Sequence, residues 1–161
     1  MTDPQISLRA LSDAADHAHL ETFYEQSEGP SYGFLQSLQD QPHFRAWYLL
    51  KDNQPVAAIW YQCVARRAEV IDLRVLASER RQGLGRQLLL ASLTALGDVC
   101  AVELEVRSSN AAARALYESL GFSERGSRTN YYATADGRED AILMTLALSH
   151  GDSVTEHSVR R

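Results

Sequence analysis

The stretch of the sequence with the clearest chemical meaning is residues 80–86, which read Arg-Arg-Gln-Gly-Leu-Gly-Arg. It lies between an extended apolar run over 70–76 and a run over 87–96 that favours a helix. Glycines let a backbone approach a ligand closely, and the free amides and positive dipole of a helix N-terminus attract negative charge. The segment therefore predicts a binding site for a phosphate-bearing ligand at the start of a helix.

Two common phosphate sites are excluded by the letters of this segment. A P-loop requires Lys and then Ser or Thr after the last glycine, where this chain has Arg86 and Gln87. A dinucleotide fingerprint requires a third small residue at the position of Leu88, and an acidic residue about 20 residues further on. Neither nucleotide-binding fold fits this chain.

A second segment, further along the chain, carries groups suited to acid and base chemistry. Residues 102–107 predict a strand, and residues 111–120 predict a helix that Asn110 caps and a glycine ends. Glu105 is a carboxylate within an otherwise apolar strand, where it is costly to bury unless something uses it. Tyr117 lies two turns into the helix, so its phenol can reach back over the strand ends.

Together the two segments resemble the GNAT family of acetyl-CoA-dependent N-acetyltransferases. The Arg/Gln-x-x-Gly-x-Gly pattern is similar to the pyrophosphate loop of that family. The stretches 104–122 and 130–142 resemble the RimI-type subfamily, which acetylates the N-terminal alanine of a small-subunit ribosomal protein. The resemblance covers residues 68–147 and implies an enzyme that moves the acetyl group of acetyl-CoA to an amine by direct attack in a ternary complex.

Acetyl transfer to an amine needs a base, a donor to the oxyanion and an acid for the departing thiolate. The resemblance assigns the base to Glu105 and the acid to Tyr117, and Glu103 is the second candidate for the base. Simpler interpretations stay open on the residues alone. Glu105 could pair with Arg107 or Arg74 on a solvated strand face, and Tyr117 could pack at the edge of the core.

The resemblance also implies where acetyl-CoA would bind. The loop would hold the pyrophosphate through backbone amides, with charge added by Arg81 and Arg86. The backbone of residues 73–75 would pair with the pantetheine arm, and Asn110 would contact CoA or only cap its helix. Because Arg74 stands where the subfamily has a small residue, we expect it to point outwards or to alter the acceptor entrance. The expected cofactor-binding residues are Leu73, Arg74, Val75, Arg81, Gln82, Gly83, Leu84, Gly85, Arg86 and Asn110.

The acceptor is less well defined by the sequence. The resemblance places Tyr131, Tyr132 and Arg138 in the acceptor-binding region, although strand and turn chemistry alone also accounts for these residues. The loop 27–33 departs from the subfamily pattern. The acceptor is therefore expected to be the N-terminus of a ribosomal protein or, alternatively, a small-molecule amine. A non-catalytic acetyl-CoA-binding module is a third hypothesis, which the intact Glu105 and Tyr117 disfavour.

The elements that must position these residues alternate along the chain. Strands are expected over 6–11, 46–51, 56–64, 69–75, 102–107, 122–132 and 141–148. Helices are expected from Ser12 or Asp13 to Glu25 and over 34–39, 87–96 and 111–120. This order predicts an α+β protein with the GNAT fold: a mixed, mostly antiparallel sheet of about six or seven strands flanked by about four helices.

Composition sets the remaining expectations. With 161 residues, 45% of them hydrophobic, the chain is long enough for one domain over 1–148. The tail 149–161 has almost no apolar residues, so we expect it to be disordered. The absence of a transmembrane-length apolar run and of a signal-like start favours a cytoplasmic protein without a membrane partner. A net charge of −5 argues against nucleic-acid binding. Cys63 and Cys100 lack metal-ligand spacing, so we expect buried, reduced thiols and no metal.

Overall fold

Seven strands form one sheet, in the order β1-β2-β3-β4-β5-β7-β6, in a computed structural model that describes residues 2–12 and 14–149. The strands are β1 (Ile6–Ala10), β2 (Phe44–Lys51), β3 (Gln54–Val64), β4 (Arg67–Val75), β5 (Ala101–Arg107), β6 (Ser123–Thr134) and β7 (Gly137–Ala147). The helices are α1 (Ala14–Glu25), α2 (Tyr32–Gln39), α3 (Leu84–Leu96) and α4 (Ala111–Ser119), with a short 3₁₀ turn, η1 (Ala77–Glu79). The predicted α+β fold is confirmed.

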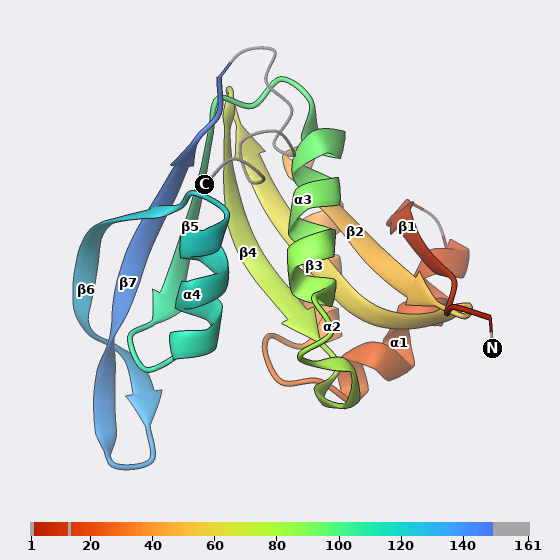
Figure 1. Cartoon of the computed structure of the whole chain (residues 1–161), viewed down its shortest axis with the longest axis horizontal. Helices are drawn as coiled ribbons and strands as arrows, with labels where there is room; N and C mark the ends of the chain where they lie inside the picture. The colour runs from red at the N-terminus through yellow and green to blue at the C-terminus, as the bar shows by residue number, and fades with distance from the viewer. Residues whose placement is uncertain (1, 13, 150–161) are drawn as a thin grey trace.

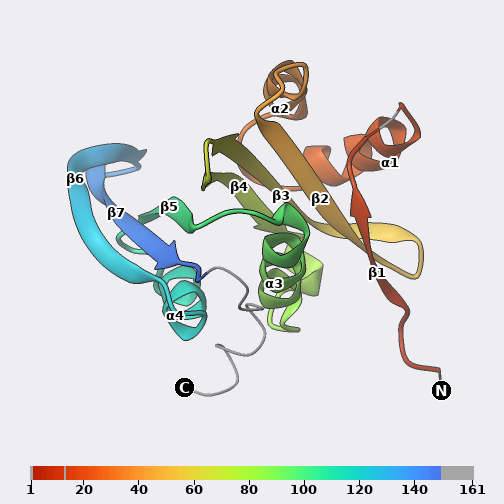
Figure 2. The ribbon, with the colours of Figure 1, turned by 90° about the horizontal axis from the view of Figure 1, so that it is seen from above.

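Helices cover both faces of this sheet. Helices α1 and α2 lie on one face, and α3 and α4 lie on the other (Figures 1 and 2). Each face has its own apolar core. Leu88 and Leu89 of α3 pack with Ile59 on one side, while Leu20 of α1 packs with Trp60 on the other. Neighbouring residues of β3 point to opposite faces because side chains alternate along a strand.

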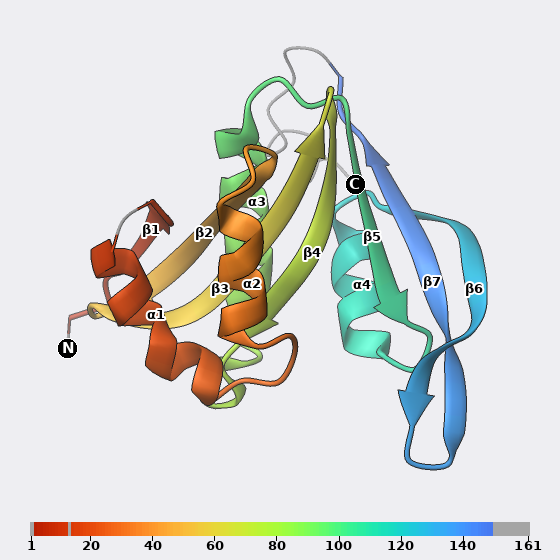
Figure 3. The same cartoon turned by 180° about the vertical axis from the view of Figure 1, so that it is seen from behind.

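One pairing in the sheet is short, and it shapes the molecule. β4 and β5 run parallel and pair only over Arg67–Glu69 with Ala101–Glu103, whereas the other neighbouring strands pair antiparallel. Beyond these residues the two strands diverge (Figures 1 and 3). We call the region between the diverging halves the β4–β5 opening. The backbone edge of β4 that faces this opening is free of strand pairing after Glu69 within the described part of the chain.

Several boundaries differ from those predicted. Helix α3 begins at Leu84, not at Gln87, so the second glycine of the loop lies inside the helix. Helix α2 begins at Tyr32 because the Ser31 side chain accepts a hydrogen bond from the Phe34 amide, 3.1 Å away. The last hairpin is longer than predicted, since β6 continues to Thr134 and β7 starts at Gly137.

Two further expectations meet the structure only in part. Cys63 and Cys100 are free thiols, but both are half-buried and not fully buried as predicted. Among the described residues, no helix has the length and apolarity needed to span a membrane. Of the tail that the sequence predicts to be disordered, residues 150–161 lie outside the described residues.

Candidate active site

The predicted phosphate loop leads into a helix whose first turn is left open. Gly83 is the N-cap of α3, with the left-handed φ of 74°, and it offers no side chain to the first amides. No acidic residue lies in the first turn. The amides of a first turn have no partner within the helix and carry the positive end of its dipole. The start of α3 therefore suits an anionic group, and binding of a phosphate there stays a prediction.

Side chains from β2 and α4 contact this loop and the start of α3. The Lys51 ammonium group at the end of β2 donates to Glu79 Oε2 at 2.8 Å and to Gln82 Oε1 at 3.1 Å. Arg86 donates from Nη1 to Ser119 Oγ at 2.8 Å, which ties α3 to α4. Gln82 and Arg86 thus make contacts within the protein, in addition to any that they would make with a phosphate. Lys51 was not predicted, because nothing in the sequence links it to a loop 28 residues away.

The end of β4 lies beside the start of α3. Leu73 and Val75 pack against the core under α3, while Arg74 between them points to the opposite face. A side chain at Gly85 would contact Val75 and Leu116 at 3.6 and 3.5 Å, so the backbones of β4, α3 and α4 converge there. The predicted cofactor-binding residues of both stretches are therefore brought together at one end of the β4–β5 opening.

Tyr117 lies on α4, on the same side of the sheet as α3. Its helix is capped as predicted, because Asn110 Oδ1 accepts a hydrogen bond from the Ala113 amide at 3.1 Å. Tyr117 is 8% exposed and packs its ring against Phe122. Burial first, and then the nearness of Asp72 and Tyr132, raises the pKa of Tyr117 to about 12. The phenol is thus fully protonated near neutral pH.

Glu105 lies on the other face of the sheet, two residues beyond the last β4–β5 pair, Glu69 with Glu103. Its side chain is 21% exposed and accepts a hydrogen bond from Arg128 Nε at 2.9 Å. Its partner is therefore neither Arg107 nor Arg74, the two arginines considered from the sequence. Glu103 is 45% exposed, pairs with Arg67 and lies where the strands are still joined. Of the two candidate bases, only Glu105 borders the opening.

A third carboxylate on this face was missed by the sequence reasoning. Burial first, and then the nearby Glu105 and Glu103, raises the pKa of Glu69. In the sequence, the alternation of side chains along β4 was the signal that could have identified Glu69. The strand has a bulge opposite Trp60 and Tyr61, and when its extra residue is counted Glu69 and Asp72 point to the same face. Glu103, Glu105 and Asp72 on this face each pair with an arginine, so much of their charge is balanced within the protein.

The predicted acceptor residues lie along β6 and the hairpin that follows it. Tyr131 is 47% exposed, its ring meets that of Tyr132 edge to face at 5.0 Å, and the Arg107 guanidinium lies 4.4 Å from the Tyr132 ring centroid. Arg138 donates to the carbonyls of Asn130 and Tyr131 at 2.6 and 3.2 Å. Arg138 thus supports the bulge that carries Tyr131, and the acceptor role of all three residues stays a prediction.

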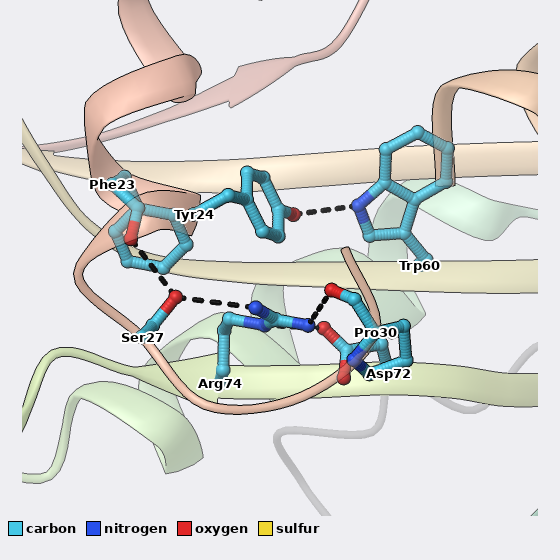
Figure 4. A network of polar contacts seen from close by, with 7 residues as sticks. All are labelled: Phe23, Tyr24, Ser27, Pro30, Trp60, Asp72 and Arg74. Carbon is cyan, nitrogen blue, oxygen red and sulfur yellow. Dashed lines mark hydrogen bonds and ion pairs between the residues drawn. The ribbon is translucent and has the colours of Figure 1, made fainter. Parts of the chain in front are cut away.

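Arg74 is buried, with 5% of its side chain exposed, and it does not point outwards (Figure 4). It lies on the face of α1 and α2 and contacts the loop between them, through Ser27 and Pro30. The first expectation stated for Arg74 is therefore wrong, and the second, an effect on the acceptor entrance, stays a prediction.

No group of three or more His, Cys, Asp or Glu side chains that could hold a metal occurs among the described residues.

This arrangement is typical of a transferase that uses a phosphate-bearing cofactor: an uncapped helix start lies beside two diverging strands, with a phenol on one face of the sheet and a carboxylate on the other. A sequence model described as the acetyltransferase (GNAT) family matches residues 9–122, and the chain belongs to that family. The resemblance read from the sequence is thereby confirmed, and the protein is an N-acetyltransferase.

Individual relatives agree with this assignment. The chain is 52% identical over 105 residues to the [ribosomal protein bS18]-alanine N-acetyltransferase of Escherichia coli (strain K12), covering 63% of this chain and 71% of the relative. It is 36% identical over 121 residues to the protein of the same name from Haemophilus ducreyi, covering 73% and 83%. The crystal structure of the ribosomal-protein-S18-alanine N-acetyltransferase from Escherichia coli superposes with a TM-score of 0.78 at 35% identity, covering 92% of this chain and 97% of that one.

Proposed function

We propose that this protein transfers the acetyl group of acetyl-CoA to the α-amine of the N-terminal alanine of ribosomal protein bS18. The proposal is supported by the relatives that carry this activity in their names, at up to 52% identity. It is also supported by the carboxylates Glu69 and Glu105 beside the β4–β5 opening, where an α-amine would arrive as a cation. Ribosomal proteins are made and assembled in the cytoplasm, so the proposed activity belongs there, carried by residues 1–148 as one domain.

The residues present fit acetyl-CoA. The pyrophosphate suits the uncapped start of α3. Gly83 has no side chain, and no atom lies within 4 Å of the place where a Cβ would be, so the backbone there is accessible. The unpaired edge of β4 over residues 73–75 suits the amides of a pantetheine arm. Bound there, acetyl-CoA supplies the thioester carbonyl that an amine attacks. Backbone amides at that edge of β4 are the candidates for stabilising the oxyanion.

The nitrogen of the ammonium must lose one proton before it attacks the carbonyl and a second as the amide forms, while the departing thiolate gains one. The two faces of the sheet supply a group for the first loss and a group for the gain, and the second nitrogen proton returns Tyr117 to its neutral form. We call the face of the sheet that α1 and α2 cover the acceptor face, and the face that α3 and α4 cover the cofactor face. Glu105 accepts the proton of the incoming ammonium on the acceptor face. Tyr117 holds a proton on the cofactor face, and its raised pKa, about 12, keeps it protonated until the leaving sulfur requires it. An α-amine has a pKa of about 8, against about 10.4 for lysine, so a carboxylate deprotonates the α-amine more readily.

The observation that carries the proposal is the position of Glu105 and Tyr117 on opposite faces at the same opening. A steady-state assay of CoA release tests it, with acetyl-CoA and three acceptors: the N-terminal peptide of bS18, the same peptide already acetylated at its α-amine, and spermidine. We expect turnover of the free peptide alone. Turnover of spermidine alone would replace the proposal by acetylation of a small-molecule amine, and no turnover of any acceptor would favour a non-catalytic module.

A further inference from the structure

The side chain of Arg74 joins β4 to the loop between α1 and α2. Its Nη1 donates to Ser27 Oγ at 3.2 Å and its Nη2 donates to the Pro30 carbonyl at 2.8 Å (Figure 4). Its Nε donates to Asp72 Oδ2 at 2.6 Å. Charge-assisted hydrogen bonds from a planar guanidinium fix both distance and direction. Arg74 therefore determines where this loop lies relative to the strand.

Aromatic rings fix the two ends of the loop around the same arginine. The guanidinium carbon lies 4.6 Å from the centroid of Tyr24, in the last turn of α1. The Tyr24 ring stacks on Tyr32, the first residue of α2, at 4.7 Å and 3° between planes. The Tyr24 hydroxyl accepts a hydrogen bond from Trp60 Nε1 at 2.6 Å. We call Tyr24, Ser27, Pro30, Trp60, Asp72 and Arg74 the Arg74 network.

The loop passes over the guanidinium so closely that only glycine fits. Gly29 has a φ of 137°, which L side chains rarely adopt. A Cβ at this position would lie 2.5 Å from Arg74 Nη2 and 2.9 Å from its Cζ. Ser27 adds a second link, because its hydroxyl donates to the Phe23 carbonyl at 2.9 Å while it accepts from Arg74. The shape of the loop and the presence of Arg74 are thus mutually dependent.

This loop borders the β4–β5 opening on the acceptor face. Figure 3 shows it crossing the end of β4 on the face that α1 and α2 cover. Glu105 points to the same face, because its neighbours Leu104 and Val106 pack into the core on the opposite face. Asp72 is near enough to Tyr117 to contribute to its raised pKa, and so is Tyr132 of β6. Asp72, which is bound to Arg74, and Tyr132 of β6 are therefore both close to Tyr117. We infer that an amine approaches between the loop held by Arg74 and the tyrosines of β6.

We propose that Arg74 is a positioning residue that sets the acceptor specificity of this enzyme, by holding the loop 27–30 in the form that an acceptor meets. The inference rests on the proposed function, since it assumes an amine acceptor on this face. Asp72 neutralises the charge of Arg74, so the loop can be fixed without a net cation beside an incoming ammonium group. Acetyl-CoA affinity is independent of the Arg74 side chain, because the cofactor is proposed to contact only backbone in this part of β4.

The test compares KM for the acceptor with KM for acetyl-CoA in wild type and in Arg74→Ala. We expect acceptor KM to rise about tenfold or more, and acetyl-CoA KM to stay within about twofold. Added methylguanidinium should lower the acceptor KM of Arg74→Ala towards the wild-type value, because it can fill the vacated site. Arg45→Ala is the control: Arg45 also lies over an aromatic ring, that of Trp47, but it is more exposed than Arg74 and donates to the carbonyls of Leu96 and Ala95 in α3, not to the loop 27–30.

A milder variant guards against loss of folding. Ser27→Ala removes one contact of the Arg74 network and should raise acceptor KM about threefold, with the same selectivity. The inference is overturned if acceptor KM is unchanged in both variants, or if both KM values rise together. If wild type turns over a small amine and not the peptide, the same comparison is made with that amine. A wild type without any turnover would refute the proposed function and this inference with it, whereas a defect confined to the variants bears on Arg74 alone.

Discussion

At the scale of single residues, the distinction between Glu105 and Glu103 is the sharpest that the structure offers. Both carboxylates are on β5, both point to the acceptor face and both pair with an arginine. They differ in position, since Glu103 lies at the last β4–β5 pair and Glu105 lies beyond it. Only the residue beyond the pairing can reach a group bound between the strands.

We therefore expect Glu105→Gln to lower kcat about 100-fold or more, because the amine loses its proton acceptor. Binding of acetyl-CoA should be unchanged, as measured by isothermal titration. Glu103→Gln tests the second candidate under the same conditions and should keep nearly full kcat. If Glu103→Gln lowered kcat more than Glu105→Gln did, the base would be Glu103 and not Glu105.

Tyr117 gives a prediction about pH. Its pKa is raised from about 10 to about 12 in the folded protein. The stability that Tyr117 contributes is therefore fully present below about pH 10 and is lost as pH rises towards 12, since the unfolded chain ionises first. Over this window the loss is about 1.4 kcal/mol per pH unit. Urea unfolding of wild type and Tyr117→Phe at pH 8, 10 and 11 measures it.

The free energy of unfolding of Tyr117→Phe should fall less steeply above pH 10 than that of wild type. Equal slopes would show that Tyr117 titrates normally and is not buried as described. The same variant should lose roughly 100-fold in kcat at pH 8 if its hydroxyl is the acid.

At the scale of elements, the start of α3 depends on a glycine in the left-handed conformation. Gly83 has a φ of 74°, and open space surrounds the position of a side chain there. Gly83→Ala should therefore cost about 1 kcal/mol through backbone strain alone, without any clash. It should also weaken acetyl-CoA binding, because the loop amides shift.

Thermal unfolding and acetyl-CoA titration measure these two effects. The control is Gly33→Ala, in α2, where φ is not in the left-handed region and nothing lies within 4 Å of the added methyl group. The Gly33→Ala protein should be as stable as wild type or slightly more stable, since alanine has a higher helix propensity than glycine. Equal effects of the two substitutions would contradict the argument from the left-handed conformation of Gly83.

Elements were also where sequence reasoning succeeded best. The Asn110 cap, the glycine turn before α3 and the hairpin of β2 and β3 are local features, and each appeared close to its predicted position. Helix α3 begins at Leu84, three residues before the predicted Gln87, so it includes Gly85, a residue of low helix propensity. The helix tolerates Gly85 because β4 and α4 pack closely against it.

At the scale of the whole molecule, the fold brings residues that are far apart in the sequence into contact around the β4–β5 opening. Ser27 and Pro30 are 47 and 44 residues from Arg74, and Arg128 is 23 residues from Glu105. No periodicity or capping rule connects residues at such separations. The sequence therefore predicted the fold and the candidate acid and base, but not their partners. The roles of Glu105, Tyr117 and the acceptor-side tyrosines stay predictions until variants are measured.

The central claim, that this enzyme acetylates the N-terminal α-amine of bS18, is tested most directly by locating the acetyl group. Purified bS18 with a free N-terminus is incubated with acetyl-CoA and enzyme, digested, and sequenced by tandem mass spectrometry. We expect wild type to place the acetyl group on the α-amine of the N-terminal alanine, and Glu105→Gln to form much less of this product. Acetyl confined to lysine side chains, or an unmodified bS18 under conditions in which the enzyme acetylates a small amine, would contradict it.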